Sequence, residues 1–324
     1  MASAALFLNA TQDAQHHFAA ATDSLNSSAN HHALGSSNST ASDIFSMTDD
    51  ELKERLHFIR EIGYGNWGSV WSCFTKDSPS REKVAVKLVH RSKTPTTAAR
   101  VKSLWNEMKI HRSFRQDSHP SIVSFHSFTI TPSFALITME YLPRLIPVEV
   151  HETKARGWFE SLLGGVHFLH RHRVSHNDIK PANILLSATC VPVLVDFGFA
   201  EHYSTHKTPK DKMFLSNLAY GTPEYLSPER AKGLTHDTRL SDMWSLGVTF
   251  FEILIGRTPF ELVEGEAFET QEDLERYWKR TKEGDWLGAE EWCKRMSKGM
   301  QSLLRRMMCP DVKRRIKAGE ALAD

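Results

Sequence analysis

Short apolar runs dominate the first part of the sequence after residue 47, and longer runs with helical spacing dominate the rest. The short runs are rich in β-branched and aromatic residues and are separated by Gly, Pro and Ser, a pattern that predicts strands. We expect strands at Phe58–Ile62, Ser69–Phe74, Lys83–Val89, Ile122–Thr129 and Phe134–Tyr141, and one helix among them at Ala98–Phe114.

After Pro147 the pattern predicts mainly helices. They are expected at Thr153–His172, Ser241–Ile255 and Thr270–Lys282, and Thr270 with Asp273 has the capping-box spacing at the start of the last one. Strands followed by helices predict an α+β fold with a small β-rich lobe and a larger, mainly helical lobe.

Residues 1–47 show no apolar period and are rich in Ala, Ser, Asn and His. Such a segment buries too little surface to offset its ordering entropy, so we predict a disordered tail at 1–47. Its paired histidines are interpreted as solvated rather than as a metal site. We expect the tail to be dispensable for catalysis.

Composition removes several classes of protein. The 324 residues carry 40 Lys and Arg against 39 Asp and Glu, a formal charge of +1. This balance argues against a protein whose main function is to bind the phosphates of nucleic acids. Four separated cysteines form no CxxC pair, which argues against a disulfide scaffold or zinc ribbon and fits a reducing compartment. No run approaches the roughly 18 apolar residues of a membrane span. We expect an intracellular protein, cytoplasmic, nuclear or both.

The first chemical motif is the glycine pattern Gly63, Gly65, Gly68, followed by Val70. Dinucleotide folds share these glycines, but there they open a helix. Here a predicted strand follows at Ser69, so the glycines mark a hairpin whose bare amides can approach a phosphate. Alone, the pattern fits an ordinary glycine-rich turn equally well.

Lys87 ends an apolar strand, where a charge is costly unless it is paired. Between Lys83 and Met139 the only carboxylates are Glu107 and Asp117, and Glu107 lies within the predicted helix. We therefore predict a Lys87–Glu107 ion pair that holds the lysine against the phosphates of a nucleotide.

Two polar clusters follow next to apolar residues. In His176–Asn183, Asp178 can accept the proton of a hydroxyl, Lys180 can neutralise a phosphate in transfer, and Asn183 can hold a metal. The predicted strand Val191–Val195 ends at Asp196, a suitable ligand for Mg²⁺.

In this order and spacing the motifs resemble those of eukaryotic-type protein kinases. Met139–Leu142 resembles the gatekeeper and hinge, Gly221–Glu229 the substrate-docking segment, and Asp242–Gly247 the start of the central helix of the large lobe. The resemblance covers Leu56 to Asp324 and implies a kinase domain at 48–324, with an N-lobe at about 56–142 and a C-lobe at about 143–324 whose last helix is cut short.

The resemblance also implies roles, with ATP and Mg²⁺ as cofactors. Gly63, Gly65 and Gly68 would cover the phosphates, Val70, Ala85 and Leu185 would surround the adenine, and Met139, Glu140 and Leu142 would form the hinge. Lys87 with Glu107 would hold the phosphates, Asp178 and Lys180 would act on the reacting groups beside Thr222, and Asn183 and Asp196 would bind Mg²⁺.

Lys180 and Thr222 resemble the Ser/Thr class of protein kinases, which implies transfer of the γ-phosphoryl group to Ser/Thr hydroxyls of proteins in signalling. The large lobe is similar to that of the calmodulin-dependent-kinase-like group. Two alternatives stay open: a pseudokinase that binds ATP as a scaffold, and a small-molecule kinase, which usually lacks a segment like Gly221–Glu229.

Several positions depart from the family pattern. Asn177 replaces the arginine that pairs with a phosphate on the activation loop, which predicts activity without phosphorylation of Ser204, Thr205, Thr208 or Ser216. His111 stands where the family usually has an apolar residue. It is interpreted either as a neutral buried side chain or as a pH-sensitive switch. We expect Cys309 to be packing, Arg314 or Arg315 to pair with Glu229, and the acidic stretch 261–299 to be a solvated face or a docking site for basic partners.

In kinases that select arginine before the phosphoacceptor, three carboxylates bind it. Two of these positions are Ala182 and Ile146 here, and Glu252 matches the third. Glu149 is close enough to Ile146 in sequence to compensate if the loop differs. The count predicts a weak preference for arginine two residues before the acceptor and little selection three residues before it.

Overall fold

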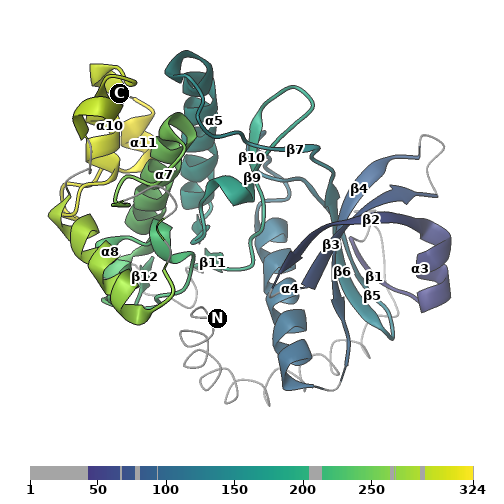
Figure 1. Cartoon of the computed structure of the whole chain (residues 1–324). Coiled ribbons are helices and arrows are strands. Elements are labelled where there is room, and N and C mark those ends of the chain that lie inside the picture. Colours follow the sequence, from purple (N-terminus) through teal and green to yellow (C-terminus); the bar gives the residue numbers. More distant parts are fainter. Residues whose placement is uncertain are drawn as a thin grey trace.

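A computed structural model describes residues 43–65, 68–76, 81–92, 94–203, 214–262, 266, 268–284 and 289–323. These residues form two lobes, a sheet with one long helix and a mainly helical body, as Figure 1 shows. This is the predicted α+β architecture.

The N-lobe is built on a six-stranded sheet with the strand order β1-β5-β6-β4-β3-β2. Its elements are β1 (Ile44–Ser46), α3 (Asp49–Arg55), β2 (Leu56–Gly65), β3 (Gly68–Thr75), β4 (Lys83–His90), α4 (Pro95–Ser113), β5 (Phe125–Ile130) and β6 (Phe134–Glu140). All pairs are antiparallel except β1 with β5. The five predicted strands correspond to β2–β6, and the predicted helix to α4.

Strand β4 is apolar on both faces because both are covered. Val84, Val86 and Leu88 pack in a small cluster with Leu52 of α3, whereas Ala85 belongs to the main core. Successive side chains of a strand point to opposite faces, so this division follows from the period of two. Lys87 therefore emerges from the sheet toward the main core, on the side of α4.

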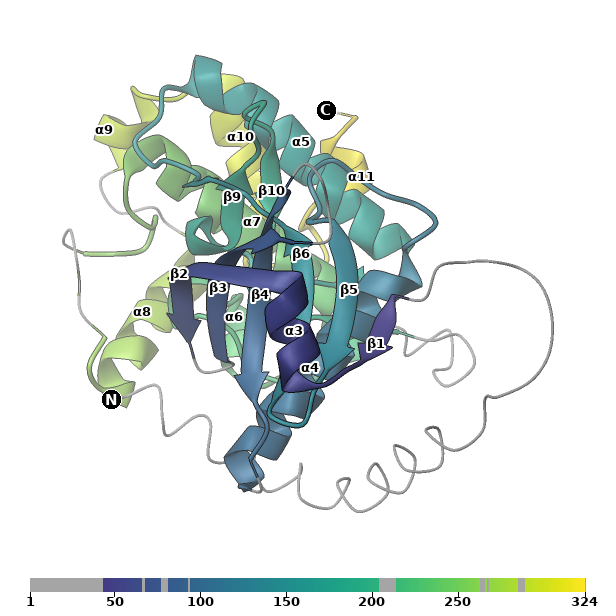
Figure 2. The ribbon, with the colours of Figure 1, turned by 90° about the vertical axis from the view of Figure 1, so that its right-hand side faces the viewer.

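Two N-lobe elements were not predicted. Strand β1 lies within residues 43–47, which the sequence assigned to the disordered tail, so that assignment is wrong for these five residues. Residues 1–42 lie outside the described part of the chain. Helix α3 begins after Thr48, whose side chain forms a capping box with Glu51. Figure 2 shows α3 across the outer face of the sheet and β1 at its edge.

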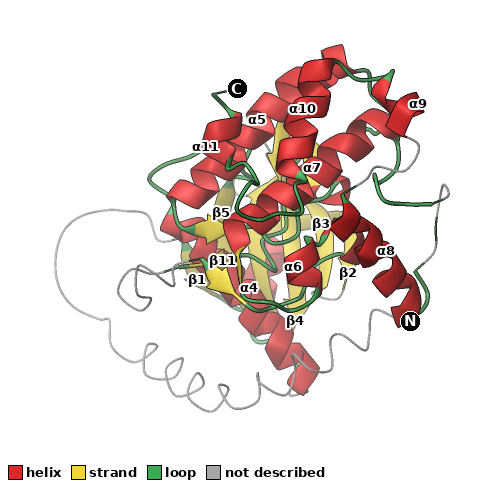
Figure 3. Ribbon diagram, turned by 90° about the vertical axis from the view of Figure 1, so that its left-hand side faces the viewer, coloured by secondary structure: helices red, strands yellow, loops and turns green. Residues whose placement is uncertain are grey.

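The C-lobe is built around the buried helix α7, with α5 beside it, and Figure 3 shows its helices from the side away from the sheet. Its main helices are α5 (Glu152–Arg171), α6 (Pro228–Ala231), α7 (Thr238–Ile255), α8 (Gln271–Glu283), α9 (Ala289–Cys293), α10 (Lys298–Met307) and α11 (Ala318–Ala321). Phe159 of α5 stacks on Phe250 of α7 with ring centroids 3.9 Å apart. The predicted capping box of Thr270 and Asp273 is confirmed.

Short strands between the helices hold the loops that carry the chemistry. They are β7 (Arg144–Leu145), β8 (Val174–Ser175), β9 (Ile184–Leu186), β10 (Pro192–Leu194), β11 (Glu201–His202), β12 (Leu215–Ser216) and β13 (His236–Asp237), with 3-10 helices at Pro181–Asn183 and Pro223–Tyr225. They pair as β10-β9-β7, β11-β8 and β12-β13. Within the described ranges, no helix has the length and hydrophobicity needed to cross a membrane.

Candidate active site

The glycine motif lies in the hairpin between β2 and β3. Gly63 pairs with Val70 and Gly65 with Gly68, and the two residues at the tip lie outside the described ranges. Gly68 has a φ of 127°, and a Cβ there would clash with the Leu88 carbonyl oxygen. A strand, not a helix, follows the glycines, so the hairpin interpretation is confirmed.

Lys87 lies at the centre of a buried ion cluster. Its Nζ donates to Glu107 Oε2 and to Asp196 Oδ1, each at 2.7 Å. The predicted Lys87–Glu107 pair is confirmed, and Asp196 is a second partner that the sequence did not reveal. Burial on its own lowers the pKa of Lys87, but Asp196 and Glu107 outweigh it and raise that pKa. Burial likewise opposes ionisation of Asp196, yet Lys87 lowers the pKa of Asp196 to about 2.

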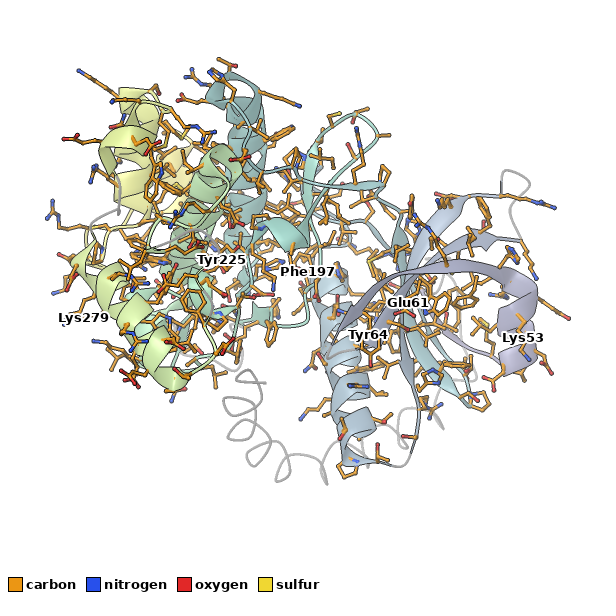
Figure 4. All side chains as sticks on the ribbon, in the orientation of Figure 1. Lys53, Glu61, Tyr64, Phe197, Tyr225 and Lys279 are labelled. Carbon is orange, nitrogen blue, oxygen red and sulfur yellow. The ribbon has the colours of Figure 1, made fainter. Side chains whose placement is uncertain are left out.

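Glu107 also connects helix α4 to the segment after β10. Its Oε1 accepts a hydrogen bond of 3.2 Å from the backbone N–H of Phe197, and Ser103 donates to the carbonyl of Gly198. Figure 4 labels Phe197 at the boundary between the two lobes. The position of α4 and that of Asp196-Phe197-Gly198 are therefore set together.

His111 lies one turn beyond Glu107 and faces Phe197. Its ring centroid is 4.7 Å from that of Phe197, and it stacks on Phe125. Burial, with the charges of Lys87 and His176, lowers the pKa of His111 to about 3. Of the two predicted readings, the neutral buried histidine therefore holds near neutral pH.

The catalytic loop brings four predicted residues into contact. Asp178 Oδ1 accepts hydrogen bonds from the Thr222 hydroxyl at 2.8 Å and its N–H at 3.0 Å, and Oδ2 accepts from the Asn183 amide at 2.9 Å. Lys180 Nζ lies 3.1 Å from Asp178 Oδ2 and donates to the Thr222 hydroxyl. A carboxylate, an ammonium and a hydroxyl thus converge at one point, with Asp178 aligned by fixed donors.

Asp242 holds this loop from below. Its buried carboxylate accepts from the backbone N–H groups of His176 and Asn177 at 3.0 and 2.8 Å and contacts His170 Nε2 at 3.0 Å. Burial alone would raise the pKa of Asp242, but these contacts, led by the hydrogen bond with His170, together outweigh burial and lower that pKa, which keeps the carboxylate ionised. The sequence placed Asp242 only at the start of a helix and missed this role.

Asn177 binds partners of both charges. Its Nδ2 donates to Glu201 Oε2 at 3.2 Å and to the carbonyl of Phe199, and its Oδ1 accepts from Arg230 Nη1 at 3.1 Å. Arg230 is 1% exposed and lies over the ring of Tyr220. The sequence indicated that Asn177 cannot bind a phosphate, but it did not reveal this network.

The residues assigned to the adenine come from both lobes. Ala85 of β4 lies opposite Met139 of β6, and both belong to the main core with Leu142. Half-buried Leu185 of β9 packs against the same core, and half-buried Val70 of β3 lies opposite Lys87 of β4. The carboxylate of Glu140 accepts from the N–H of Ser124 at 3.3 Å. Ala85 and Lys87 share one face of β4, so these apolar residues adjoin the ion cluster.

Asn183 and Asp196 suit a cation held jointly with phosphates. The Asn183 amide nitrogen faces Asp178, which leaves its oxygen as a ligand, and the Asp196 side chain is 38% exposed. Among the described residues there is no group of three or more His, Cys, Asp or Glu side chains placed to bind a metal. Two protein oxygens with phosphate oxygens fit Mg²⁺, which rarely uses an all-protein cage.

The segment Gly221–Glu229 is anchored at its end. Arg315 makes two hydrogen bonds to Glu229, of 2.6 and 3.0 Å. Of the two arginines considered from sequence, Arg315 is thus the partner, and Arg314 is exposed.

The described geometry agrees with comparisons to known proteins. A family model of the protein kinase domain matches residues 56–324. This chain belongs to that family. The kinase domain is 32% identical over 219 residues to the serine/threonine-protein kinase SAPK3 of Oryza sativa subsp. indica, which covers 65% of this chain and 60% of the relative.

Two further relatives bear similar names. Serine/threonine-protein kinase SRK2A of Physcomitrium patens is 33% identical over 228 residues, 68% of this chain and 60% of the relative. Serine/threonine-protein kinase SRK2D of Arabidopsis thaliana is 34% identical over 217 residues, 64% of this chain and 55% of the relative. The kinase domain thus spans less than two thirds of the relatives that it matches. Their names do not point to the calmodulin-dependent-kinase-like group, and that assignment stays a prediction.

Proposed function

We propose that this kinase domain transfers the γ-phosphoryl group of Mg-ATP to Ser/Thr hydroxyls of proteins. The observation that carries the proposal is the convergence of Lys180 and Thr222 on Asp178, with Asn183 fixing the same carboxylate. The names of the relatives, all serine/threonine-protein kinases, support the class of acceptor.

Each residue contributes position or charge rather than a covalent bond, which is how phosphoryl transfer is catalysed in general. Asp178 would orient the acceptor hydroxyl and take its proton. Lys180 would stabilise the charge on the group in transfer, and Lys87 would hold the phosphates. Asn183 and Asp196 would bind Mg²⁺, which neutralises phosphate charge when bound.

The two alternatives find less support. A pseudokinase typically lacks one of the central groups, whereas Lys87, Asp178, Asn183 and Asp196 are all present and in contact with their partners. A small-molecule kinase usually lacks the docking segment, whereas here Glu229 is bound by Arg315.

Two substitutions test the proposal. Lys87→Met should lower phosphotransfer at least about 100-fold, because it removes the cation that holds the phosphates. Asp178→Asn should lower kcat by about 100-fold or more while ATP affinity is largely kept, because the base acts after the nucleotide binds. The measurements are phosphotransfer to a protein substrate, nucleotide binding, and thermal unfolding as a check of folding. Turnover like that of the wild type in either variant contradicts the mechanism.

We further propose a weak preference for arginine two residues before the acceptor, read by Glu252. Ala182 is uncharged and Ile146 is buried, so neither supplies a carboxylate. Glu252 accepts a hydrogen bond from the Tyr225 hydroxyl, and burial, with Glu224 and Glu261 nearby, raises the pKa of Glu252. A cation between these carboxylates would relieve their repulsion. Profiling a positional peptide library tests this, and a dominant arginine requirement three residues upstream would refute it.

The remaining proposals concern surroundings. A formal charge of +1 supports protein rather than nucleic-acid partners. Four cysteines without disulfide spacing support an intracellular location, in the cytoplasm, the nucleus or both. Fractionation of cells that produce a tagged chain tests the location.

A further inference from the structure

The segment 43–55 precedes the residues matched by the family model, yet it is bound to the N-lobe at several points. Strand β1 pairs in parallel with β5, where the N–H of Phe128 donates to the Asp43 carbonyl at 2.8 Å. Asp49 accepts hydrogen bonds from the N–H and hydroxyl of Ser133, and Leu52 of α3 is buried against Val84, Val86 and Leu88 of the sheet. The segment therefore extends the sheet by one strand at its β5 edge, as Figure 2 shows.

The side chain of Asp43 reaches from this strand to helix α4. It is 5% exposed, and its Oδ2 lies 3.2 Å from Arg112 Nε and 2.9 Å from Arg115 Nη1. Arg112 is in the last turn of α4, and Arg115 follows the helix end. Among the described residues Oδ2 makes no hydrogen bond, so the two half-exposed arginines hold Asp43 by charge alone. A buried carboxylate needs such partners, which makes both contacts sensitive to loss of the charge. One short segment thus ties the sheet edge to the end of α4.

Helix α4 carries Glu107, five residues before Arg112. A helix moves as a rigid body over this length, so a restraint on its last turn also restrains the carboxylate that binds Lys87. The opposite end of α4, at Thr94 and Pro95, is exposed, and its capping contacts are local. The restraint from Asp43 therefore acts at the end of α4 that lies nearer to Glu107.

We propose that Asp43 is a positioning residue for the phosphotransfer reaction. Through Arg112 and Arg115 it fixes α4 so that Glu107 reaches Lys87, and it does so within the chain, without a partner protein. This inference rests on the proposed function for its kinetic readout. It differs from the expectation that all of residues 1–47 are dispensable, since it assigns a role to Asp43.

Asp43→Asn tests the proposal, because it removes the charge and keeps the shape. The matched control is Asp50→Asn, which breaks an ion pair with Lys53 in the same segment where both side chains are exposed. We expect Asp43→Asn to lower kcat/KM about tenfold, a typical coupling between separate sites, and Asp50→Asn to leave it unchanged. Equal activity of the two variants would overturn the proposal.

A second comparison separates positioning from general stability. In a Glu107→Gln background the ion pair is already weakened, so Asp43→Asn should cost little further activity there. A merely structural role would give the same tenfold loss in both backgrounds. Truncation gives a third comparison: a chain starting at Asp43 should keep its activity, and one starting at Thr48 should lose at least as much as Asp43→Asn. Equal activity of the two truncated chains would contradict the proposal.

Hydrogen exchange provides a readout that does not depend on catalysis. Asp43→Asn should speed amide exchange in the second half of α4, from Glu107 to Ser113, and Asp50→Asn should not. Unchanged exchange would overturn the proposal even if the intact chain showed no phosphotransfer. An inactive wild-type chain with faster exchange in Asp43→Asn would instead count against the proposed function alone.

Discussion

Two buried titratable side chains of this domain are accommodated in different ways, one as a paired charge and one as a neutral ring. Lys87 is charged and has two carboxylate partners, whereas His111 is packed among Phe114, Phe125 and Phe197 with no hydrogen bond to its Nδ1. A charge in such an aromatic site would be costly, which is why burial lowers the pKa of His111 to about 3. His111 thus acts as an aromatic packing residue at working pH.

This environment predicts a stability that falls as the pH is lowered. Between the ordinary histidine pKa of about 6.5 and the folded value of about 3, the unfolded chain binds a proton at His111 that the folded chain does not. The contribution is therefore complete only well above pH 6.5 and declines as the pH falls, by about 1.6 kcal/mol between pH 6.5 and pH 5. Urea unfolding of wild type and His111→Phe at both pH values measures it.

Other histidines also titrate in this range, so the difference between the two proteins is the informative quantity. His111→Phe keeps the aromatic packing and removes the titrating group, and its loss of stability should be smaller by that amount. An identical pH dependence in both proteins would show that folding does not lower the pKa of His111.

At the scale of elements, hydrogen bonds link Asn177 of the catalytic loop to β11, which precedes residues 204–213, and to α6, which follows them. Glu201 of β11 accepts hydrogen bonds from Asn177 and from the Tyr203 hydroxyl, and Arg230 of α6 binds the other side of Asn177. Ser216 of β12 is 9% exposed and accepts from the N–H of Leu218, which makes it a poor phosphoacceptor. Ser204, Thr205 and Thr208 lie outside the described residues.

We therefore predict that phosphatase-treated protein keeps its phosphotransfer activity to within about twofold.

A substitution tests the same network. Glu201→Gln should lower kcat about tenfold, because hydrogen bonds to a charged group contribute about 1.5–3 kcal/mol. Glu269→Gln, at an exposed carboxylate, is the matched control. Loss of activity on phosphatase treatment would mean that the loop needs a phosphate after all.

The elements that the sequence predicted are those with a period of their own. Helices α4, α5 and α8 bury residues at helical spacing, and strand β4 and helix α7 are continuous buried runs. The catalytic motifs fall between such elements. Strand β1 has three residues and no repeat, and its stability comes from β5, over 80 residues away. Asp43 looks like a tail residue until Arg112 and Arg115 are placed beside it.

The same limit applies within the site. The Lys87–Glu107 pair could be predicted because, of the two carboxylates between Lys83 and Met139, only Glu107 lay within the predicted helix. Contacts such as Arg230 with Asn177 or Asp242 with the catalytic-loop amides join distant segments whose residues have several polar neighbours to choose from. Which of these polar side chains pair depends on how α6 and α7 pack against the catalytic loop.

At the scale of the whole molecule, one buried ion pair joins the docking segment to the end of the chain. Arg315 is fully buried, binds Glu229 through two hydrogen bonds and donates to the carbonyls of Cys309 and Leu240. Its guanidinium also lies over the ring of Trp244 of α7. Although burial opposes it, Arg315 lowers the pKa of Glu229, so the carboxylate stays ionised. The pair thus ties the docking segment to the residues after α10.

Arg315→Leu should destabilise the domain by about 3–5 kcal/mol, because it leaves the Glu229 carboxylate buried without its partner. The double substitution Arg315→Leu/Glu229→Leu should recover part of this loss, since it removes the unpaired charge. Arg314→Leu, at the exposed neighbour, should change the free energy of unfolding by less than about 0.5 kcal/mol. Urea unfolding of wild type, Arg315→Leu, Glu229→Leu, the double variant and Arg314→Leu provides the measurement. A loss in the double variant equal to the sum of the Arg315→Leu and Glu229→Leu losses would show that the pair contributes no coupling.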